Sequence, residues 1–220
     1  MYGPDREKYP KPDLTMEIPL WEKGLTLVAG VDEAGRGALA GPVAAAAVIL
    51  PAETTIGEGL WGVKDSKEMS PNSRNVWARK LKVVCLAYGV GYASHNEIDS
   101  IGIAPATLLA MKRALKKLKF KPEHILVDYL VLSGILIPQT SITKGDRISL
   151  SIASASIIAK TSRDSLMRRH SKKYPAYGFE KNKGYGTLYH RKVLAELGAS
   201  PIHRQSFKVK GIVCDNNCDI

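Results

Sequence analysis

Residues 25–50 read LTLVAGVDEAGRGALAGPVAAAAVIL, two apolar runs separated by a glycine-rich turn. The first run, residues 25–31, is short and continuously apolar and leads into Asp32 and Glu33, which is typical of a strand buried on both faces. The second run, residues 42–50, is rich in alanine, but the prolines that bound it limit its length to that of a strand. This stretch therefore predicts a buried hairpin with two carboxylates where the first strand ends.

The flanking sequence predicts an α/β fold around that hairpin. Residues 83–94 are mainly apolar and predict a third strand, which would join the hairpin in an antiparallel meander. A helix at 104–118 precedes a short apolar run at 125–127, and a helix followed by a strand predicts that this strand lies parallel to an earlier one. Further helices are predicted at 70–81, 150–170 and 188–197, and a further strand at 136–142.

Size and composition are those of a soluble globular protein. The 220 residues are enough for one substantial hydrophobic core. No apolar run approaches the roughly 20 residues that span a bilayer, and residues 1–24 lack the apolar region of a secretory signal and read as a polar leader. Three cysteines, Cys85, Cys214 and Cys218, are too few for a disulfide framework and predict a reducing cytoplasm. Two free thiols near the C-terminus are favoured over the alternative of a zinc site there.

The net charge of +11 is concentrated toward the C-terminus. Residues 160–210 contain 13 Lys and Arg against three acids, a local net charge of +10, and the same stretch carries six Tyr and Phe. Positive charge attracts phosphates and aromatic faces stack on bases or sugars. Nucleic-acid binding is therefore favoured over the alternative, a solvated basic surface that serves only solubility.

Four acids stand where predicted buried strands end or a helix begins: Asp32, Glu33, Asp128 and Asp146. Sites in open α/β sheets form beyond strand ends, and carboxylates gathered there would repel one another unless a cation neutralised them. Oxygen-only ligation suits Mg²⁺ or Mn²⁺, and such ions support the hydrolysis of phosphodiesters. The acids therefore predict a metal-dependent phosphoryl-transfer site.

Each acid also has a structural alternative. A lone Asp at a strand end often caps a turn or a helix, and Asp146 could cap the helix that follows it. Asp65 lies between two lysines and could form a surface ion pair. Asp164 has Lys160 and Arg168 four residues to either side, a spacing that favours pairing on a helix surface.

Two glycine-rich segments are candidate ligand contacts. Around residues 35–37 (GRG), the glycines would let the backbone approach a ligand while the guanidinium reaches a phosphate. Residues 184–187 (GYGT) would present a ring and small polar groups. An ordinary glycine-rich turn is the alternative in both cases.

Taken together, these segments resemble the ribonuclease HII family, the type 2 ribonucleases H. The run GVDEAGRGALAGPV at 30–43 is a highly specific signature of that family. Further segments match in the family's order: 64–67 (KDSK), 126–128 (LVD), 144–146 (KGD), 151–160 with 163–164, 184–187 (GYGT) and 203–207 (HRQSF). The resemblance covers residues 25–207, almost the whole chain.

The resemblance implies an RNase H-like α/β fold, with a central five-stranded mixed sheet flanked by helices and a small helical C-terminal part. It divides the chain into a polar leader at 1–24, a catalytic domain at 25–170, and a C-terminal helical subdomain and tail at 171–220. It also implies that two divalent ions, Mg²⁺ or Mn²⁺, act during catalysis. The implied catalytic and metal-binding acids are Asp32, Glu33, Asp128 and Asp146.

The implied activity is endonucleolytic, on RNA/DNA hybrids and on DNA duplexes with embedded ribonucleotides. The phosphodiester 5′ to a ribonucleotide would be hydrolysed, leaving a 3′-hydroxyl and a 5′-phosphate. The turn of Gly35, Arg36 and Gly37 would line the 2′-OH. Tyr185 would contact that hydroxyl, the group that distinguishes RNA from DNA, and stack on the next sugar. Phosphate contacts are implied for Lys64, Ser66 and Lys67.

The chain departs from the family pattern at two positions. Tyr129 stands after the third acid, where the family usually has Gly, and within a strand its side chain should point away from Asp128. Ser154 replaces the usual Ala. Asp164 belongs to a family motif and rivals Asp146 as the fourth acid, but we prefer Asp146 because it matches the family's acid just before the helix.

Other classes make different predictions. The related ribonuclease HIII carries a sizeable extra N-terminal domain, whereas about two dozen residues precede the first strand here. We therefore expect a type HII enzyme and not a type HIII enzyme. A non-catalytic hybrid-binding protein would not need the four acids, and a structural basic protein would not prefer an embedded ribonucleotide. We expect a monomer, because no apolar heptad or surplus apolar stripe needs a partner. We expect no membrane association, because no apolar run is long enough to span a bilayer.

Overall fold

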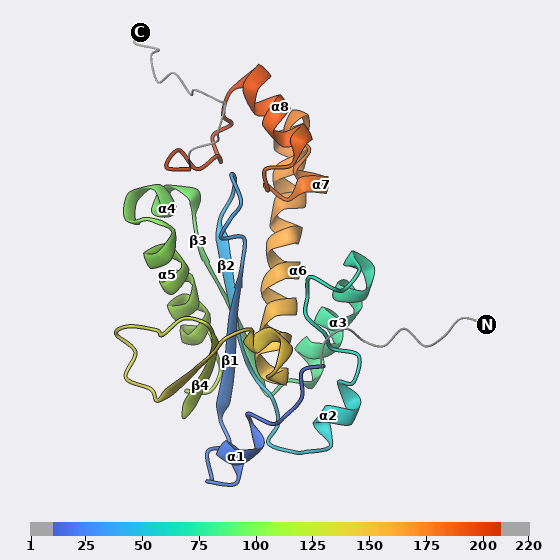
Figure 1. Cartoon of the computed structure of the whole chain (residues 1–220), viewed down its shortest axis with the longest axis vertical. Helices are drawn as coiled ribbons and strands as arrows, with labels where there is room; N and C mark the ends of the chain where they lie inside the picture. The colour runs from blue at the N-terminus through green and yellow to red at the C-terminus, as the bar shows by residue number, and fades with distance from the viewer. Residues whose placement is uncertain (1–10, 208–220) are drawn as a thin grey trace, which may run out of the picture.

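The fold is built on a five-stranded mixed sheet in the order β3-β2-β1-β4-β5 (Figure 1). The computed structural model describes residues 11–207, and Cys214 and Cys218 lie outside them. The strands are β1 Val28–Ala34, β2 Val43–Ile49, β3 Ala87–Ala93, β4 His124–Asp128 and β5 Gln139–Ile142. β1 pairs antiparallel with β2 and parallel with β4, β3 pairs antiparallel with β2, and β5 pairs parallel with β4. The predicted hairpin, meander and parallel strand are confirmed.

Helices cover both faces of the sheet. α6 Leu150–Lys173 packs on β1 and β2 with α3 Pro71–Val84 beside it, and α5 Ile103–Lys116 packs on β2 and β3 from the other side (Figure 1). No helix among residues 11–207 is long and apolar enough to cross a membrane. The shorter helices are α1 Ile18–Trp21, α2 Ile56–Gly59, α4 His95–Ile101, α7 Phe179–Asn182, α8 Leu188–Leu197 and the 3-10 turns η1 Gly145–Arg147 and η2 Pro175–Tyr177.

Two glycines let the helices approach the sheet closely. A Cβ at Gly30 in β1 would lie 2.2 Å from the carbonyl carbon of Ser151 in α6. A Cβ at Gly91 in β3 would lie 2.1 Å from the carbonyl oxygen of Ala110 in α5. Both distances are far shorter than a van der Waals contact, so a larger residue at either position would push a helix away from the sheet.

The first strand is longer than the sequence predicts. The apolar pattern predicts a strand that ends before Asp32, but β1 continues to Ala34. Asp32 pairs with Ala46 of β2, and Glu33 pairs with Ala45. The two acids therefore lie inside the strand, where an ideal pleat would direct their side chains to opposite faces, yet they remain close enough for the charge of Glu33 to raise the pKa of Asp32.

α4 is missing from the elements predicted by periodicity. Its N-cap is Ser94, whose side chain accepts a hydrogen bond from the Glu97 N–H, while the Glu97 carboxylate accepts one from the Ser94 N–H. This capping box is visible in the sequence as S-x-x-E. The helix has only seven residues, too few for a periodic apolar pattern. By contrast, Ser70 and Pro71 begin α3 as predicted.

Residues 11–24 pack against the rest of the protein and are not a loose polar leader. Leu14 is buried, and Glu17 is fully buried beside the start of α6. Glu17 Oε1 accepts hydrogen bonds from Ser149 Oγ at 2.6 Å and from Ser151 Oγ and N at 2.7 and 2.9 Å. This segment therefore holds the N-terminal end of α6 in place.

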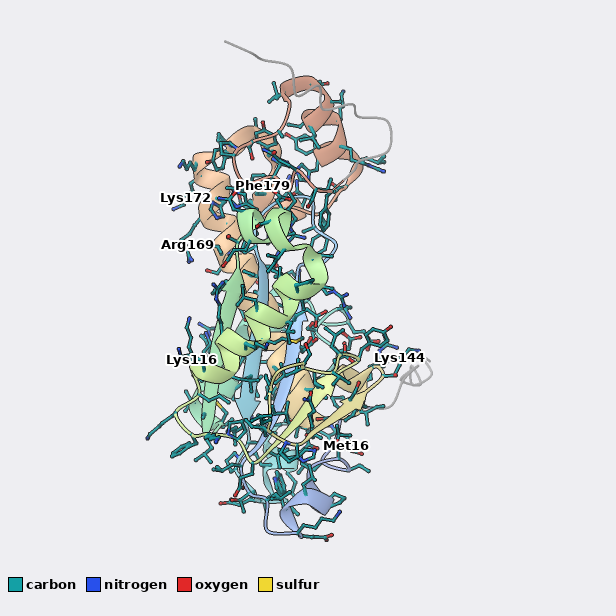
Figure 2. All side chains as sticks on the ribbon, turned by 90° about the vertical axis from the view of Figure 1, so that its left-hand side faces the viewer. Met16, Lys116, Lys144, Arg169, Lys172 and Phe179 are labelled. Atoms are coloured by element: carbon teal, nitrogen blue, oxygen red, sulfur yellow. The ribbon has the colours of Figure 1, made fainter. Side chains whose placement is uncertain are left out.

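Beyond α6 the chain forms a small helical part with its own aromatic core, around the labelled Phe179 (Figure 2). Tyr177, Phe179, His190 and His203 are in ring contact, with centroids 5.1 to 5.7 Å apart. The Nε2 atoms of the two histidines lie 3.0 Å apart, and burial lowers the pKa of both, that of His203 to about 4. Burial therefore favours the neutral form of both rings, which pack as part of this small core.

Gly30→Ala is expected to lower the free energy of unfolding by about 3 kcal/mol, because the added methyl group meets helix backbone that cannot rotate away. Chemical denaturation of both proteins measures the difference. Gly59→Ala is the matched control, since a Cβ there has nothing within 4 Å, and it is expected to be neutral or stabilising. A Gly30 variant as stable as the Gly59 variant would contradict the close packing of α6 on β1.

Candidate active site

The four predicted acids come from three elements that meet beside the end of β4. Asp32 and Glu33 lie in β1, Asp128 is the last residue of β4, and Asp146 lies in η1, directly before α6. β1 and β4 pair in register up to the residue before Asp32 and Asp128, so these two acids stand at the same level on neighbouring parallel strands. The structure thus brings together residues that are far apart in the sequence.

Electrostatic interactions among the acids reflect how close they are. Burial raises the pKa of Asp32 well above its ordinary value, and the negative charges of Glu33 and Asp128 raise it further. Burial also raises the pKa of Glu33, as does the charge of Asp128. The pKa of Asp128 is raised by burial and by the charge of Asp146. Acids in this environment favour the entry of a cation, which would stabilise their ionised forms.

Cationic side chains neutralise the cluster only in part. Lys67 Nζ lies 3.4 Å from Asp146 Oδ2, and Arg36 Nη1 lies 3.4 Å from Glu33 Oε1. These are long contacts from partly or largely exposed side chains, so each contributes little. Burial acts to lower the pKa of Lys67, but the nearby carboxylates, that of Asp146 first, raise it overall. The Lys67 side chain is 77% exposed, so its charged end can reach a phosphate.

The KDSK segment sends two of its side chains inward. Asp65 is 3% exposed and accepts a hydrogen bond from Arg147 Nε at 3.1 Å, so the alternative of a surface ion pair is wrong. Ser66 is equally buried and shares a 2.9 Å hydrogen bond with Ser156 of α6, which in turn bonds the Asp32 carboxylate. This position suits Ser66 to orienting Asp32 through Ser156, and the implied phosphate contact of Ser66 stays a prediction.

The donor set of the cluster is entirely oxygen, which is the set that Mg²⁺ and Mn²⁺ prefer. Among residues 11–207, no three His, Cys, Asp or Glu side chains are gathered closely enough to hold a metal ion as they stand. One oxygen of Asp128 accepts a hydrogen bond from the Gly145 N–H, and one of Asp32 accepts from the Glu33 N–H, both at 2.7 Å. Repulsion separates like charges, so these side chains would rotate inward around a cation. The donor chemistry and the uncompensated charge fit a divalent ion.

A buried arginine holds the glycine-rich turn that follows β1. Arg204 is 3% exposed and donates to the carbonyls of Gly35 and Arg36 at 2.7 Å and of Gly41 at 2.9 Å. Burial lowers its pKa to about 9, so it remains charged at neutral pH. Gly35 has a φ of 93°, in the left-handed region that favours glycine. The shape of the GRG turn is therefore set by Arg204 from the far end of the chain.

A second buried arginine joins this turn to the GYGT loop. Arg163 of α6 is fully buried and donates at 2.8 to 3.1 Å to the carbonyls of Ala40, Pro42 and Lys183. Its guanidinium lies 5.3 Å from the centroid of the Tyr185 ring. The two glycine-rich segments are thereby placed side by side. The sequence alone does not single out either arginine as a site residue, because their role depends on contacts between distant segments.

Asp164 does not join the acid cluster. It pairs with Lys160 Nζ at 3.0 Å, as the helical spacing predicts. A second ion pair joins it to Arg74 of α3 at 4.0 Å, and among residues 11–207 Arg168 forms no ion pair with it. The charges of Asp146 and, less strongly, Asp65 raise the pKa of Asp128, whereas Asp164 is not among its neighbours in the described chain, so the arrangement favours Asp146 over Asp164 as the fourth member.

Local structure explains both departures from the family pattern. Tyr129 lies just beyond β4, not within a strand as predicted, and it has a φ of 61° and is 66% exposed. A residue other than glycine costs about 1 kcal/mol in this left-handed conformation, which accounts for the usual Gly. Ser154 is buried in α6, where its hydroxyl donates to the Leu150 carbonyl at 2.7 Å.

Comparison of the sequence with known proteins gives one consistent family. The family model described as Ribonuclease HII matches residues 29–210. A protein named Ribonuclease HII from Synechococcus sp. (strain JA-3-3Ab) is 53% identical over 201 residues, which cover 91% of this chain and 90% of the relative. Another from Desulfitobacterium hafniense (strain Y51) is 50% identical over 88% of this chain and 73% of the relative. These matches span all the elements that carry the acids.

Solved structures share the fold. Ribonuclease H2 from Pyrococcus horikoshii OT3 superposes with a TM-score of 0.69 at 26% identity, covering 82% of this chain and 93% of that one. RNase HII from Archaeoglobus fulgidus, solved in a complex with PCNA, also superposes with a TM-score of 0.69 at 26% identity. This match covers 87% of this chain and 100% of that one. Bst-RNase HIII, solved in complex with Mn²⁺, has the same fold at 22% identity, with a TM-score of 0.63 over 83% of this chain and 67% of that one. The predicted RNase H-like fold is confirmed.

Asp32→Asn is expected to raise the melting temperature of the metal-free protein at pH 7 by about 2–4 °C, the equivalent of roughly 1 kcal/mol. Because the pKa of Asp32 is raised in the folded protein, the protein loses stability as the pH rises through that pKa and the carboxyl group ionises. The amide of the Asp32→Asn variant would carry no charge at any pH, so the variant avoids this loss. Calorimetry in a chelator measures the change. Added Mg²⁺ should reduce or reverse the difference in melting temperature between the variant and the wild type, because it stabilises the wild type.

Asp99→Asn is the control with the opposite sign. Although burial acts to raise the pKa of Asp99, hydrogen bonds from Ser206 and Gln205 lower it overall. Loss of that charge should therefore lower the melting temperature. An Asp32 variant less stable than the wild type in chelator would contradict the electrostatic description of the site.

Proposed function

Because this chain belongs to the ribonuclease HII family, a family of RNase H endoribonucleases, we propose that it hydrolyses the phosphodiester 5′ to a ribonucleotide, in RNA/DNA hybrids and in DNA with embedded ribonucleotides. The products are a 3′-hydroxyl and a 5′-phosphate. One observation carries the proposal: β1 runs from Asp32 and Glu33 directly into the GRG turn, and Arg36 of that turn pairs with Glu33. The acids and the element suited to ribose recognition are continuous in the chain.

The acids would hold two divalent cations, Mg²⁺ or Mn²⁺, with Asp32 and Asp128 as the most direct ligands and Glu33 and Asp146 completing the site. When bound, such a pair of ions neutralises the carboxylates and polarises the attacking and leaving oxygens of a phosphodiester. Ser66 and Ser156 supply the support that a ligating carboxylate needs, because their hydrogen bonds hold Asp32 in one orientation.

Basic side chains at the rim would bind the scissile strand. Lys67 is charged, exposed and placed beside Asp146, so its ammonium can contact a phosphate next to the acids. Arg36 extends from the GRG turn and is partly exposed, which suits it to a second phosphate oxygen. Lys64 precedes the buried Asp65 in the same segment and would contribute to the same surface.

Ribonucleotide selection would come from the two joined loops. Gly35 and Gly37 let the backbone approach the sugar, and a Cβ at Gly35 would overlap the Arg163 side chain at 2.0 Å from Nε. Tyr185 would contact the 2′-OH and stack on the next sugar. Its ring lies over the guanidinium of Arg163 and 5.2 Å from Lys160 Nζ, contacts that fix its orientation. Two rigid loops can distinguish a ribonucleotide from a deoxyribonucleotide well, because they lose little conformational entropy on binding.

Cleavage of a DNA duplex that carries one ribonucleotide, with Mg²⁺ or Mn²⁺ and an all-DNA control, tests the proposal. We expect a single cut 5′ to the ribonucleotide, abolished by chelator. Asp128→Asn should lower kcat/KM at least about 100-fold, because it removes a charged ligand. Glu196→Gln is the control and should retain the activity, since Glu196 pairs only loosely with Lys192 on the exposed surface of α8.

Two other outcomes would change the proposal. Cutting only within long RNA/DNA hybrids would keep the nuclease but remove the assigned role of the GRG turn and Tyr185. No cutting of either substrate by a folded sample, with either metal, would replace hydrolysis with binding of RNA/DNA duplexes alone.

A further inference from the structure

A second basic groove lies between α3, α6 and the outer strand β3, away from the acids. It encloses about 720 Å³. Arg79 and Lys82 of α3 line one side, and Arg168 and Arg169 of α6 line the other. The last two belong to the basic C-terminal stretch, and none of the four takes part in the site described above.

The groove holds uncompensated positive charge. None of its lining residues is acidic, and within the described chain none of these four cations has an ion-pair partner. Arg74 and Lys160, on the same two helices, do pair with Asp164. Four unpaired cations that face one hollow repel one another, and an anion in the groove would relieve that repulsion.

Neutral polar groups complete the lining. Asn75 and Ser165 face the groove from α3 and α6, and Tyr92 faces it from β3. Amide, hydroxyl and phenol groups donate hydrogen bonds to phosphate and sugar oxygens. The groove also runs on into a second hollow of about 530 Å³, which shares Ser165, Arg168 and Arg169 and extends to Lys172. One acid, Glu180, lines that far end. The elongated shape suits a polymer of phosphates better than a single small anion.

The groove lies on the opposite side of α6 from the acids. Ser156, which bonds Asp32, and Ser165, which lines the groove, are nine residues apart in α6, a rotation of about 180° around a helix with 3.6 residues per turn. Arg169 and Lys172 project from one side of the molecule in Figure 2, and Lys144, next to Gly145 and Asp146, projects from the other. A straight duplex in the active site would not also fill this groove.

We propose that the α3–α6–β3 groove is a second nucleic-acid site, which binds the phosphate backbone of a DNA or RNA segment other than the one being cleaved. Binding is through charge and hydrogen bonds to the backbone, so it is independent of base sequence. The protein would thereby hold on to nucleic acid while its active site samples another segment.

Fluorescence anisotropy with an all-DNA duplex of about 12 base pairs, just over one helical turn, tests the proposal in chelator, where no cleavage is involved. Two double variants remove charge from opposite walls: Arg79→Gln with Lys82→Gln, and Arg168→Gln with Arg169→Gln. Each should weaken binding at least about tenfold. Each should also make the slope of log K against log salt concentration shallower by about 0.9 for each phosphate that is no longer neutralised. At saturation the wild type should bind one duplex more per chain than either variant.

Lys116→Gln with Lys119→Gln is the control of equal charge, because both lysines are exposed and lie outside the groove. It should change the affinity less than about twofold, and circular dichroism confirms that all the variants are folded. Equal losses of affinity in the control and the groove variants, or equal stoichiometry in all the proteins, would overturn the proposal. Because the readout is binding without metal, its failure is distinguishable from a failure of the proposed nuclease function.

Discussion

Carboxylates that are removed from water and held beside one another cannot all stay charged without a compensating cation. Asp32 is the extreme case, since it is 5% exposed and its pKa is raised first by burial and then by Glu33 and Asp128. The sheet creates this situation because β4 ends beside β1 while β1 continues. The end of one strand therefore meets the middle of another, and acids from both face a common space.

One helix aligns the two halves of the site. Ser156 and Arg163 are seven residues apart in α6, about two turns, so they lie on the same side of the helix. Ser156 bonds Asp32, and Arg163 holds the carbonyls of the turn and loop that flank Tyr185. Gly30 lets α6 lie close against β1, with a separation that leaves no room for a side chain. The acids and the two glycine-rich segments are thus held by the same rigid element, a condition that the proposed positioning of a substrate requires.

The sequence predicts the architecture well because its signals are local. Apolar runs of strand length, helical spacing and the caps at Ser70 and Gly198 lie within a few residues of the elements they define. The acids are predictable for the same reason, since each stands at or near an element boundary. The burial of Asp65, the Ser66–Ser156 contact and the contacts of the two buried arginines with the turn after β1 join chain segments 82 to 169 residues apart, and no local pattern encodes them. The position of Tyr129 is predicted wrongly because the left-handed turn after β4 is invisible when the residue is not glycine.

Anomalous diffraction from crystals grown with Mn²⁺ tests most directly whether the four acids form a metal site. We expect Mn²⁺ bound by carboxylate oxygens of Asp32 and Asp128 at roughly 2 Å, with Glu33 and Asp146 turned toward the same position. That result would show that the raised pKa values and the partial neutralisation by Lys67 and Arg36 belong to a site built for cations. Mn²⁺ bound only elsewhere, or no bound Mn²⁺ at millimolar concentration with the acids still apart, would contradict it.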